Sequence, residues 1–364
     1  MTGQLFIGIM SGTSLDGIDV ALTELDDSRC KVVATHFLPY AAEIKSALLE
    51  LHFPSENELE KTALIANQLA RLYTQAVNEL LIKTKLKSNQ IKAIGCHGQT
   101  IRHRPELGFT LQIGNAALLA ELTHICVVSD FRSRDIAAGG QGAPLVPAFH
   151  QAVFGSKTKN RVILNIGGIA NITYLPASGK VLGFDSGPGN MLLDSWAKLK
   201  LGKDFDANGA WAATGVVHDN FLNQLLSEPY FALPPPKSTG RDLFNDLWLK
   251  QHILYPYCRP QDIARTLVEL SARSIEQAVS MHCPAVDEIY LCGGGAHNGL
   301  LVERLTQMLK LPILTTDALG VGVDWVEAAA FAWLAKKSLE QKPSNLPEVT
   351  GAHGLRILGA VYPA

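Results

Sequence analysis

The sequence predicts an α/β protein with a duplicated domain, and three observations support this prediction. Apolar segments of strand length alternate with longer segments of helical periodicity along most of the chain. An opening arrangement of strand, small-residue turn and strand returns about 155 residues later. The 364-residue chain is long enough for about two domains, and 47% hydrophobic against 18% charged residues excludes a disordered protein.

The first half opens with a strand over 5–10 and a turn rich in Ser, Gly and Asp. Ile18, Val20 and Leu22 then alternate with period two, which predicts a second strand. Further along, the pattern predicts a strand at 31–37, one or two long helices within 56–86, strands at 91–95 and 110–113, and a helix at 116–122.

The second half repeats the opening pattern. A strand from 161 leads to the turn Gly167-Gly168, a second strand at 169–175 and a third at 181–184. The remaining predicted elements are helices at 261–281, 299–309 and 325–339 and a strand at 288–292. Between the two halves, the Gly- and Pro-rich segment 130–147 is predicted to be a crossover between the two domains.

Composition excludes several classes of partner. With 32 basic and 34 acidic residues the net charge is -2, so no basic surface for nucleic acid is expected. No apolar segment approaches the ~20 residues of a membrane span, and no signal peptide is recognisable. The six cysteines have no C-x-x-C spacing and read as reduced thiols. We therefore expect a cytoplasmic protein that binds neither nucleic acid nor membrane.

Three glycine-rich turns follow predicted strands and could bind phosphate through backbone N–H groups. The P-loop pattern is absent, so these turns are the alternative route to phosphates. In the first turn, GTSLDGID, Asp16 and Asp19 could hold a metal ion directly or through water. A polar hairpin turn without a ligand is the other interpretation.

A fourth segment, FDSGPGN, places Asp185 at the end of a predicted strand, with a turn over 186–189 and a helix beginning near Asn190. Ligands of α/β folds bind at the carboxyl ends of strands, so Asp185 is a candidate for chemistry. A structural Asx-turn or helix N-cap is the alternative. The charged segment DFRSRD, which contains Arg134, is either a solvated loop or a source of ligands for a sugar or carboxylate.

Taken together, these motifs resemble the anhydro-N-acetylmuramic acid kinases of the actin-like, sugar-kinase and Hsp70-type ATPase superfamily. The resemblance covers nearly the whole chain, and its segments occur in order: IGIMSGTSLDGIDVAL, CHGQTIRH, LQIGNAALLAE, DFRSRDIAAGGQGAPLVPAFH, LNIGGIANIT, GFDSGPGNMLLD, PKSTGRDLFN, LCGGGAHN and VTGAHGLRILGAVYP.

The resemblance implies a duplicated actin-like (ribonuclease H-like) fold with two domains around a nucleotide cleft. The expected domains are 1–135 plus 325–364, and 136–324, with hinges near Gly139-Gly140 and before Trp325. The family converts 1,6-anhydro-N-acetylmuramic acid, ATP and water to N-acetylmuramic acid 6-phosphate and ADP during peptidoglycan recycling. ATP and Mg²⁺ are the expected cofactors, and a homodimer is expected from the family.

By the same resemblance, Asp185 is the base that activates the attacking water, and Asp16 and Asp19 are metal ligands. Arg134, Glu327 and, more weakly, His97 are expected to contact the sugar. The expected nucleotide contacts are Gly12, Thr13, Ser14, Leu15, Asp16, Gly17, Ile18, Asp19, Gly167, Gly168, Gly293, Gly294, Gly295 and Asn298.

Two other functions remain open at this level. In an ordinary hexose or amino-sugar kinase Asp185 would deprotonate a free hydroxyl, and labelled water would leave no ¹⁸O at C1. A non-catalytic nucleotide switch of actin or Hsp70 type would bind ATP without turning over any sugar.

Overall fold

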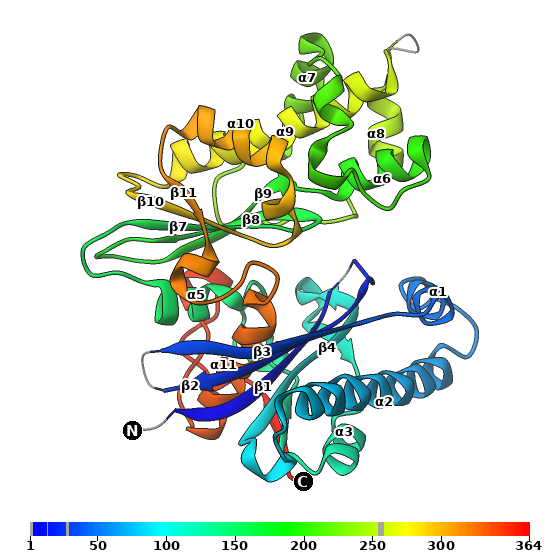
Figure 1. The fold of residues 1–364 in the computed structure, drawn as a ribbon, viewed down its shortest axis with the longest axis vertical. Helices are drawn as coiled ribbons and strands as arrows, with labels where there is room; N and C mark the ends of the chain where they lie inside the picture. Colours follow the sequence, from blue (N-terminus) through cyan, green and yellow to red (C-terminus); the bar gives the residue numbers. More distant parts are fainter. Residues whose placement is uncertain (1–2, 13, 27–28, 254–257) are drawn as a thin grey trace. The chain divides into compact units, whose positions relative to one another are not determined.

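Two compact units make up the structure, which is a computed structural model describing residues 3–12, 14–26, 29–253 and 258–364 (Figure 1). Unit 1 comprises Met1–Phe154 and Gly320–Ala364, and unit 2 comprises Gly155–Leu319. The divisions therefore lie after Phe154 and Leu319, whereas the sequence predicted them after residues 135 and 324.

The first division lies later than predicted because the Gly- and Pro-rich segment is part of unit 1. The helix α5 (Val146–Phe154) packs against α11 (Val326–Leu339), and Gln141 N donates to Thr350 O at 2.7 Å. The segment 130–147 is therefore no crossover, and the predicted hinge at Gly139-Gly140 lies inside unit 1.

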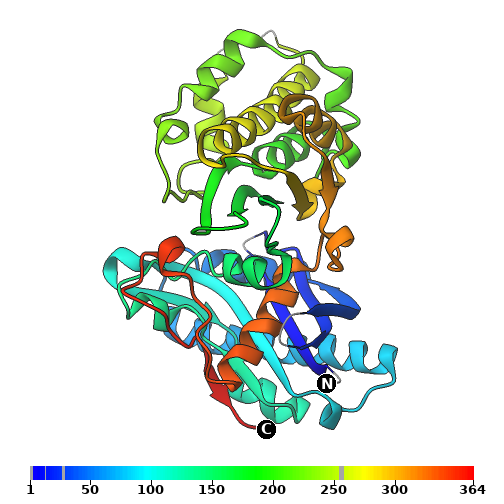
Figure 2. The same ribbon diagram turned by 90° about the vertical axis from the view of Figure 1, so that its left-hand side faces the viewer.

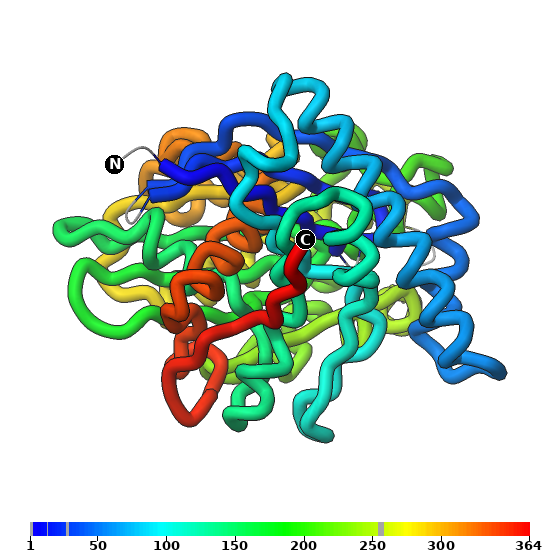
Figure 3. The backbone as a smooth tube through the Cα atoms, turned by 90° about the horizontal axis from the view of Figure 1, so that it is seen from below, coloured from blue at the N-terminus to red at the C-terminus, as the bar shows by residue number. Residues whose placement is uncertain are grey.

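Unit 1 contains a seven-stranded sheet of order β12-β6-β4-β1-β2-β3, with β5 paired to β4. The first three strands are antiparallel neighbours, whereas β4 runs parallel to β1 and β6 parallel to β4. Their bounds are β1 (Gln4–Ser11), β2 (Gly17–Leu25), β3 (Cys30–Pro39), β4 (Ala93–Arg104), β5 (Phe109–Ile113), β6 (Val127–Ser129) and β12 (Ala360–Tyr362). Figure 3 traces the C-terminal segment, in red, to the sheet edge where β12 pairs with β6.

Unit 2 repeats this arrangement in a five-stranded sheet of order β11-β10-β7-β8-β9. Again three antiparallel strands come first, then β10 lies parallel to β7 and β11 parallel to β10. The bounds are β7 (Arg161–Ile166), β8 (Ile169–Leu175), β9 (Leu182–Pro188), β10 (Glu288–Cys292) and β11 (Ile313–Thr315). The shared order β6-β4-β1-β2-β3 and β11-β10-β7-β8-β9 confirms the predicted duplication.

Every predicted helix is present, and the region 56–86 forms one long helix. The helices that match predictions, besides α11, are α2 (Glu58–Thr84), α3 (Ala116–Thr123), α6 (Met191–Leu201), α9 (Pro260–His282) and α10 (Gly299–Leu309). Helices that were not predicted, besides α5, are α1 (Ala42–Glu50), α4 (Ser133–Ile136), α7 (Asp219–Leu226), α8 (Asp246–His252) and α12 (Pro347–Thr350). Within the described residues, no helix is long and apolar enough to cross a membrane.

Opposite faces of the unit 1 sheet carry α2 and α11 (Figures 1 and 2). Ile7 and Ile9 of β1 belong to the same buried cluster as Tyr73 of α2. Gly8 points to the other face, because side chains alternate along a strand. A Cβ at Gly8 would lie 1.7 Å from Ala328 O, and one at Gly95 would lie 1.9 Å from Phe331 O. Glycine on both strands therefore lets α11 lie directly on the sheet.

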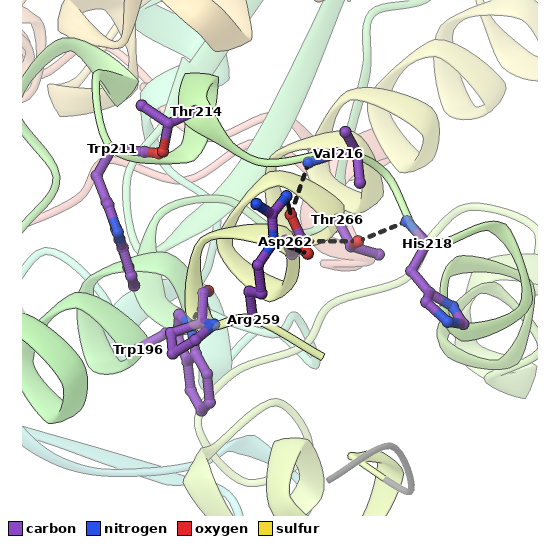
Figure 4. Close-up of polar contacts among 9 residues, drawn as sticks. Trp196, Trp211, Thr214, Val216, His218, Arg259, Asp262 and Thr266 are labelled. Atoms are coloured by element: carbon purple, nitrogen blue, oxygen red, sulfur yellow. Dashed lines mark hydrogen bonds and ion pairs between the residues drawn. The ribbon is translucent and has the colours of Figure 1, made fainter. Parts of the chain in front are cut away.

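The core of unit 2 forms around α9, which packs against α6, α7 and α10. Figure 4 shows the hydrogen bonds between the start of α9 and the segment before α7. Asp262 Oδ1 accepts from Val216 N at 2.9 Å, and Thr266 Oγ1 accepts from His218 N at 3.0 Å. These contacts align the helix that supports β9.

One local prediction near Asp185 is wrong. The sequence predicted a turn over 186–189, but β9 continues through Ser186 and Gly187 to Pro188. Ala170 of β8 pairs with Gly187, and Ser186 Oγ donates to Ala170 O at 3.1 Å. Pairing with β8 therefore overrides the turn preference of Gly and Pro, and α6 begins only at Met191.

Candidate active site

The turn between β1 and β2 is held closed by its own polar groups. Ser14 Oγ donates to Asp16 Oδ1 at 2.7 Å, and Gly17 N donates to the same oxygen at 3.0 Å. Gln99 of β4 donates to Gly12 O at 3.0 Å. Leu15 has a φ of 57°, in the left-handed region that side chains rarely adopt, and burial of its side chain offsets that cost. Thr13 lies outside the described residues.

Acidic side chains gather beside this turn. Burial, followed by the nearby carboxylates of Asp16, Glu327 and Asp324, raises the pKa of Asp19 to about 7. All four residues belong to unit 1, and Glu327 is the second residue of α11. The repulsion between these carboxylates would be relieved by a bound cation.

This acidic group fits the Mg²⁺ that the family implies. Mg²⁺ binds oxygen ligands and keeps several waters, so one or two protein carboxylates suffice. Asp16 retains an oxygen beyond the one bound by Ser14 and Gly17. Across the described parts of the chain, no three His, Cys, Asp or Glu side chains are grouped as a complete protein metal site.

In unit 2, two of the predicted glycine turns lie together at the carboxyl end of β7. Asn190 N donates to Gly167 O at 2.8 Å, which joins the β7–β8 turn to the start of α6. A Cβ at Gly293 would lie 2.3 Å from Asn165 Oδ1, and one at Gly295 would lie 2.3 Å from Ile166 Cγ2. Only glycine permits this approach of the 293–295 loop to β7.

Two of the predicted nucleotide contacts have structural roles. The Ile18 side chain is fully buried in the unit 1 core, so only its backbone could meet a nucleotide. Asn298 caps α10 by accepting from Leu301 N at 3.2 Å. A nucleotide contact through the Asn298 amide nitrogen stays a prediction.

Asp185 lies on β9, opposite Asn171 of β8. Thr239 N donates to its carboxylate Oδ2 at 3.0 Å, while Tyr230 Oη donates to its backbone carbonyl at 2.8 Å. Burial raises the pKa of Asp185 to about 6, and the Thr239 N–H and the Lys237 ammonium group act in the opposite direction. A pKa near the working pH suits a general base.

Within the DFRSRD segment, Arg132 makes the contacts described next, whereas the side chain of Arg134 is exposed. Arg132 Nη1 donates to Gly142 O at 2.7 Å, and Arg132 Nη2 lies 2.9 Å from His97 Nε2. Burial and Arg132 lower the pKa of His97 to about 3. His97 is therefore neutral, and its Nε2 accepts from Arg132.

Glu327 completes this arrangement in unit 1. Burial raises the pKa of Glu327, the positive charge of Arg132 acts to lower it, and Asp16 acts to raise it. Arg132 thus lies between a neutral histidine and an acidic neighbour. Arg134 is the predicted sugar contact of this segment, and that contact stays a prediction. The local sequence does not show which of the two arginines bonds to His97.

Each unit has the sheet order of the actin-like fold, with a short turn after its first strand and glycines in both turns. This duplicated sheet order is that of the actin-like fold, which ATPases and sugar kinases share.

The family model for anhydro-N-acetylmuramic acid kinase matches residues 4–364. The chain is 55% identical to the anhydro-N-acetylmuramic acid kinase of Nitrosomonas europaea over 362 residues, covering 99% of each chain. It is 50% identical to that of Nitrosospira multiformis over 100% of each chain. The chain belongs to the anhydro-N-acetylmuramic acid kinase family, and the protein is a sugar kinase of peptidoglycan recycling.

More distant similarity is found among solved structures. The activator of the 2-hydroxyisocaproyl-CoA dehydratase from Clostridium difficile, with bound ADPNP, is 14% identical with a TM-score of 0.49 and coverage of 93% of this chain and 98% of that chain. A ROK family glucokinase from Streptomyces griseus is 11% identical with a TM-score of 0.43 and coverage of 92% and 99%.

Proposed function

We propose that Asp185 is the general base of the reaction and that it activates the water that opens the anhydro ring. The observation that carries this proposal is the state of its carboxylate. Thr239 binds Oδ2, and no other hydrogen bond to the carboxylate is found among the described residues. Oδ1 is thus available to accept a proton, with a pKa of about 6 for the group.

The chemistry explains why a base is required at the anomeric carbon. The oxygen that attacks the γ-phosphorus is O6, which carries no proton because it bridges C1 and C6. Asp185 takes a proton from water, the water oxygen bonds to C1, and the C1–O6 bond breaks. The electron pair released to O6 attacks the γ-phosphorus, and ADP leaves with the electrons of the broken P–O bond. The second water proton stays on the new C1 hydroxyl.

ATP is the phosphoryl donor, and backbone N–H groups are the proposed phosphate contacts, with the β1–β2 turn as the candidate in unit 1 and Gly167-Gly168 as the candidate in unit 2. Phosphoryl transfer has a loose, highly charged transition state, so backbone N–H groups held in place can stabilise it. Mg²⁺ would be held by Asp16 and Asp19, and it neutralises phosphate charge when bound. The 293–295 loop, fixed against β7, is assigned to the nucleoside.

Glu327 is the sugar contact best supported by the structure. It lies in the first turn of α11, whose position is fixed by the close approach to Gly8 and Gly95. The positive charge of Arg132, which is bonded to His97, favours the ionised form of Glu327. A sugar contact by Arg134 stays a prediction, as does the cytoplasmic location that the family's recycling role supports.

The test is the Asp185→Asn variant. We expect it to fold, to bind ATP with unchanged affinity and to lose turnover by a factor of about 10³, because the amide cannot accept the proton. Asp194→Asn is the matched control, since burial also raises the pKa of Asp194 to about 7 but the residue lies on α6. Retention of activity in Asp185→Asn, measured as phosphorylated product, would falsify the assignment.

A further inference from the structure

A second segment of unit 2 attaches to β9 at Asp185. Asp185 N donates to Lys237 O at 3.1 Å, and Thr239 N donates to Asp185 Oδ2 at 3.0 Å. Residues 237–239 therefore bind both the backbone and the side chain of Asp185. They belong to PKSTGR, which is part of one of the segments that carry the family resemblance and has no predicted role.

The Lys237 side chain is held in place rather than free in solvent. Its Nζ donates to Tyr230 O at 3.3 Å and to Phe231 O at 3.2 Å, and it lies 4.8 Å from the centroid of the Tyr230 ring. Tyr230 in turn donates its hydroxyl to the carbonyl of Asp185 at 2.8 Å. One residue, Tyr230, thus fixes both the ammonium group and the strand that carries the carboxylate.

We propose that Lys237 is a positioning residue for Asp185. Its backbone carbonyl holds the N–H of Asp185, and its ammonium group, fixed on two carbonyl oxygens, favours the ionised carboxylate. This inference rests on the proposed role of Asp185 as the base. Lys237 itself does not transfer a proton, because its ammonium group is directed at backbone carbonyl oxygens.

The other groups around Asp185 do not replace this charge. Tyr230 contributes a neutral phenol, because burial and Asp185 raise its pKa. On α9, His282 has a lowered pKa through burial and the charge of Lys237, so it is neutral near pH 7. On β8, the partner of Asp185 is the uncharged Asn171.

Two opposing effects act on the carboxylate. Burial favours the protonated form, whereas the Thr239 N–H and the Lys237 ammonium group favour the ionised form. Loss of the Lys237 charge removes one of the two contributions that favour the ionised form. A larger fraction of the enzyme would then carry a protonated Asp185 at neutral pH, and that fraction cannot act as a base.

The experiment compares Lys237→Met with Lys237→Arg in the full-length protein, using the dependence of kcat/KM on pH. In Lys237→Met we expect the acidic limb to move about one pH unit upward, the size typical of losing a nearby opposite charge. The fall in kcat/KM should therefore be greatest below pH 7 and small above pH 8. Lys237→Arg keeps the charge and should retain the limb of the original protein.

An unmoved acidic limb in Lys237→Met, or equal displacement in Lys237→Arg, would overturn the inference. If Lys237→Met does not fold, Lys237→Gln serves as the second variant. Titration of the Asp185 carboxyl carbon by NMR, assigned by its loss in Asp185→Asn, measures the same displacement without turnover. An active Asp185→Asn would instead refute the base itself, so the two failures are distinguishable.

Discussion

Burial raises the pKa of Asp185, yet the proposed role of this residue as a base requires a charged carboxylate. Its burial favours the neutral form, yet the proposed reaction needs the ionised form. Since the pKa of about 6 exceeds the ordinary 3.8, the folded protein binds a proton here between about pH 4 and 6 that the unfolded chain has released. The contribution of Asp185 to the free energy of unfolding is therefore largest below pH 4 and decreases as pH rises through 6.

From this we predict that Asp185→Asn, although inactive, is more stable than the original protein at pH 8. The variant avoids the free-energy cost of burying an ionised Asp185, which is up to about 3 kcal/mol for a pKa difference of about two units. Near pH 3, below both pKa values, the two proteins should have similar stability, because Asp185 is then mostly neutral in the folded and the unfolded state. Urea unfolding at pH 3 and pH 8 measures this, and an equal difference at both pH values would contradict it.

The hydrogen bond between Arg132 and His97 also depends on protonation, because only a neutral His97 can accept from the charged Arg132. Since the pKa of His97 is about 3, its acceptor role toward Arg132 does not change across the physiological range. Burial lowers the pKa of Arg132 to about 10, and the Glu327 and Asp135 carboxylates oppose that effect. Arg132 therefore stays positively charged beside Glu327.

Elements of unit 1 are joined by one buried carboxylate, that of Asp135 in α4. Its Oδ1 accepts from Asn345 Nδ2 at 2.8 Å and from Thr350 Oγ1 at 2.9 Å. Its Oδ2 accepts from Gly142 N at 2.8 Å. Because Gly142 O also accepts from Arg132, the C-terminal segment helps to hold Arg132 in place.

We predict that Asp135→Asn lowers the free energy of unfolding by about 2 kcal/mol. The amide NH₂ would face a hydrogen-bond donor, which leaves buried donors without an acceptor. Asp130→Asn is the matched control in the same segment, where an exposed residue should change stability by less than about 0.5 kcal/mol. Chemical unfolding of both variants provides the comparison, and equal losses would contradict a special role for Asp135.

At the scale of the whole molecule, unit 2 is a continuous segment and unit 1 is not. The buried core of unit 2 is formed by its own residues, between Val162 and Leu305. Unit 1 needs both ends of the chain, because α11 covers β1 and β4 and β12 completes the sheet. The homodimer expected from the family stays a prediction.

We therefore predict that the fragment 155–319 folds alone, whereas the fragment 1–154 does not. Removal of 320–364 takes away α11 and exposes the apolar sheet face that it covers. Circular dichroism during heating should show a cooperative transition for 155–319 and none for 1–154. A gradual, non-cooperative loss of signal from 155–319 would show that unit 2 depends on unit 1.

The sequence by itself determined the order of the predicted elements, the duplication, the glycine-rich turns and the apolar residues that lead into Asp185. These features are local, because strand alternation, helical spacing and small-residue turns act over a few neighbouring residues. Tertiary structure alone decided that β9 continues past Ser186, that Arg132 rather than Arg134 points inward, and that the 237–239 segment binds Asp185. The Asp135–Thr350 bond spans 215 positions. Such pairs depend on how distant strands and loops pack, and local periodicity carries no information about that packing.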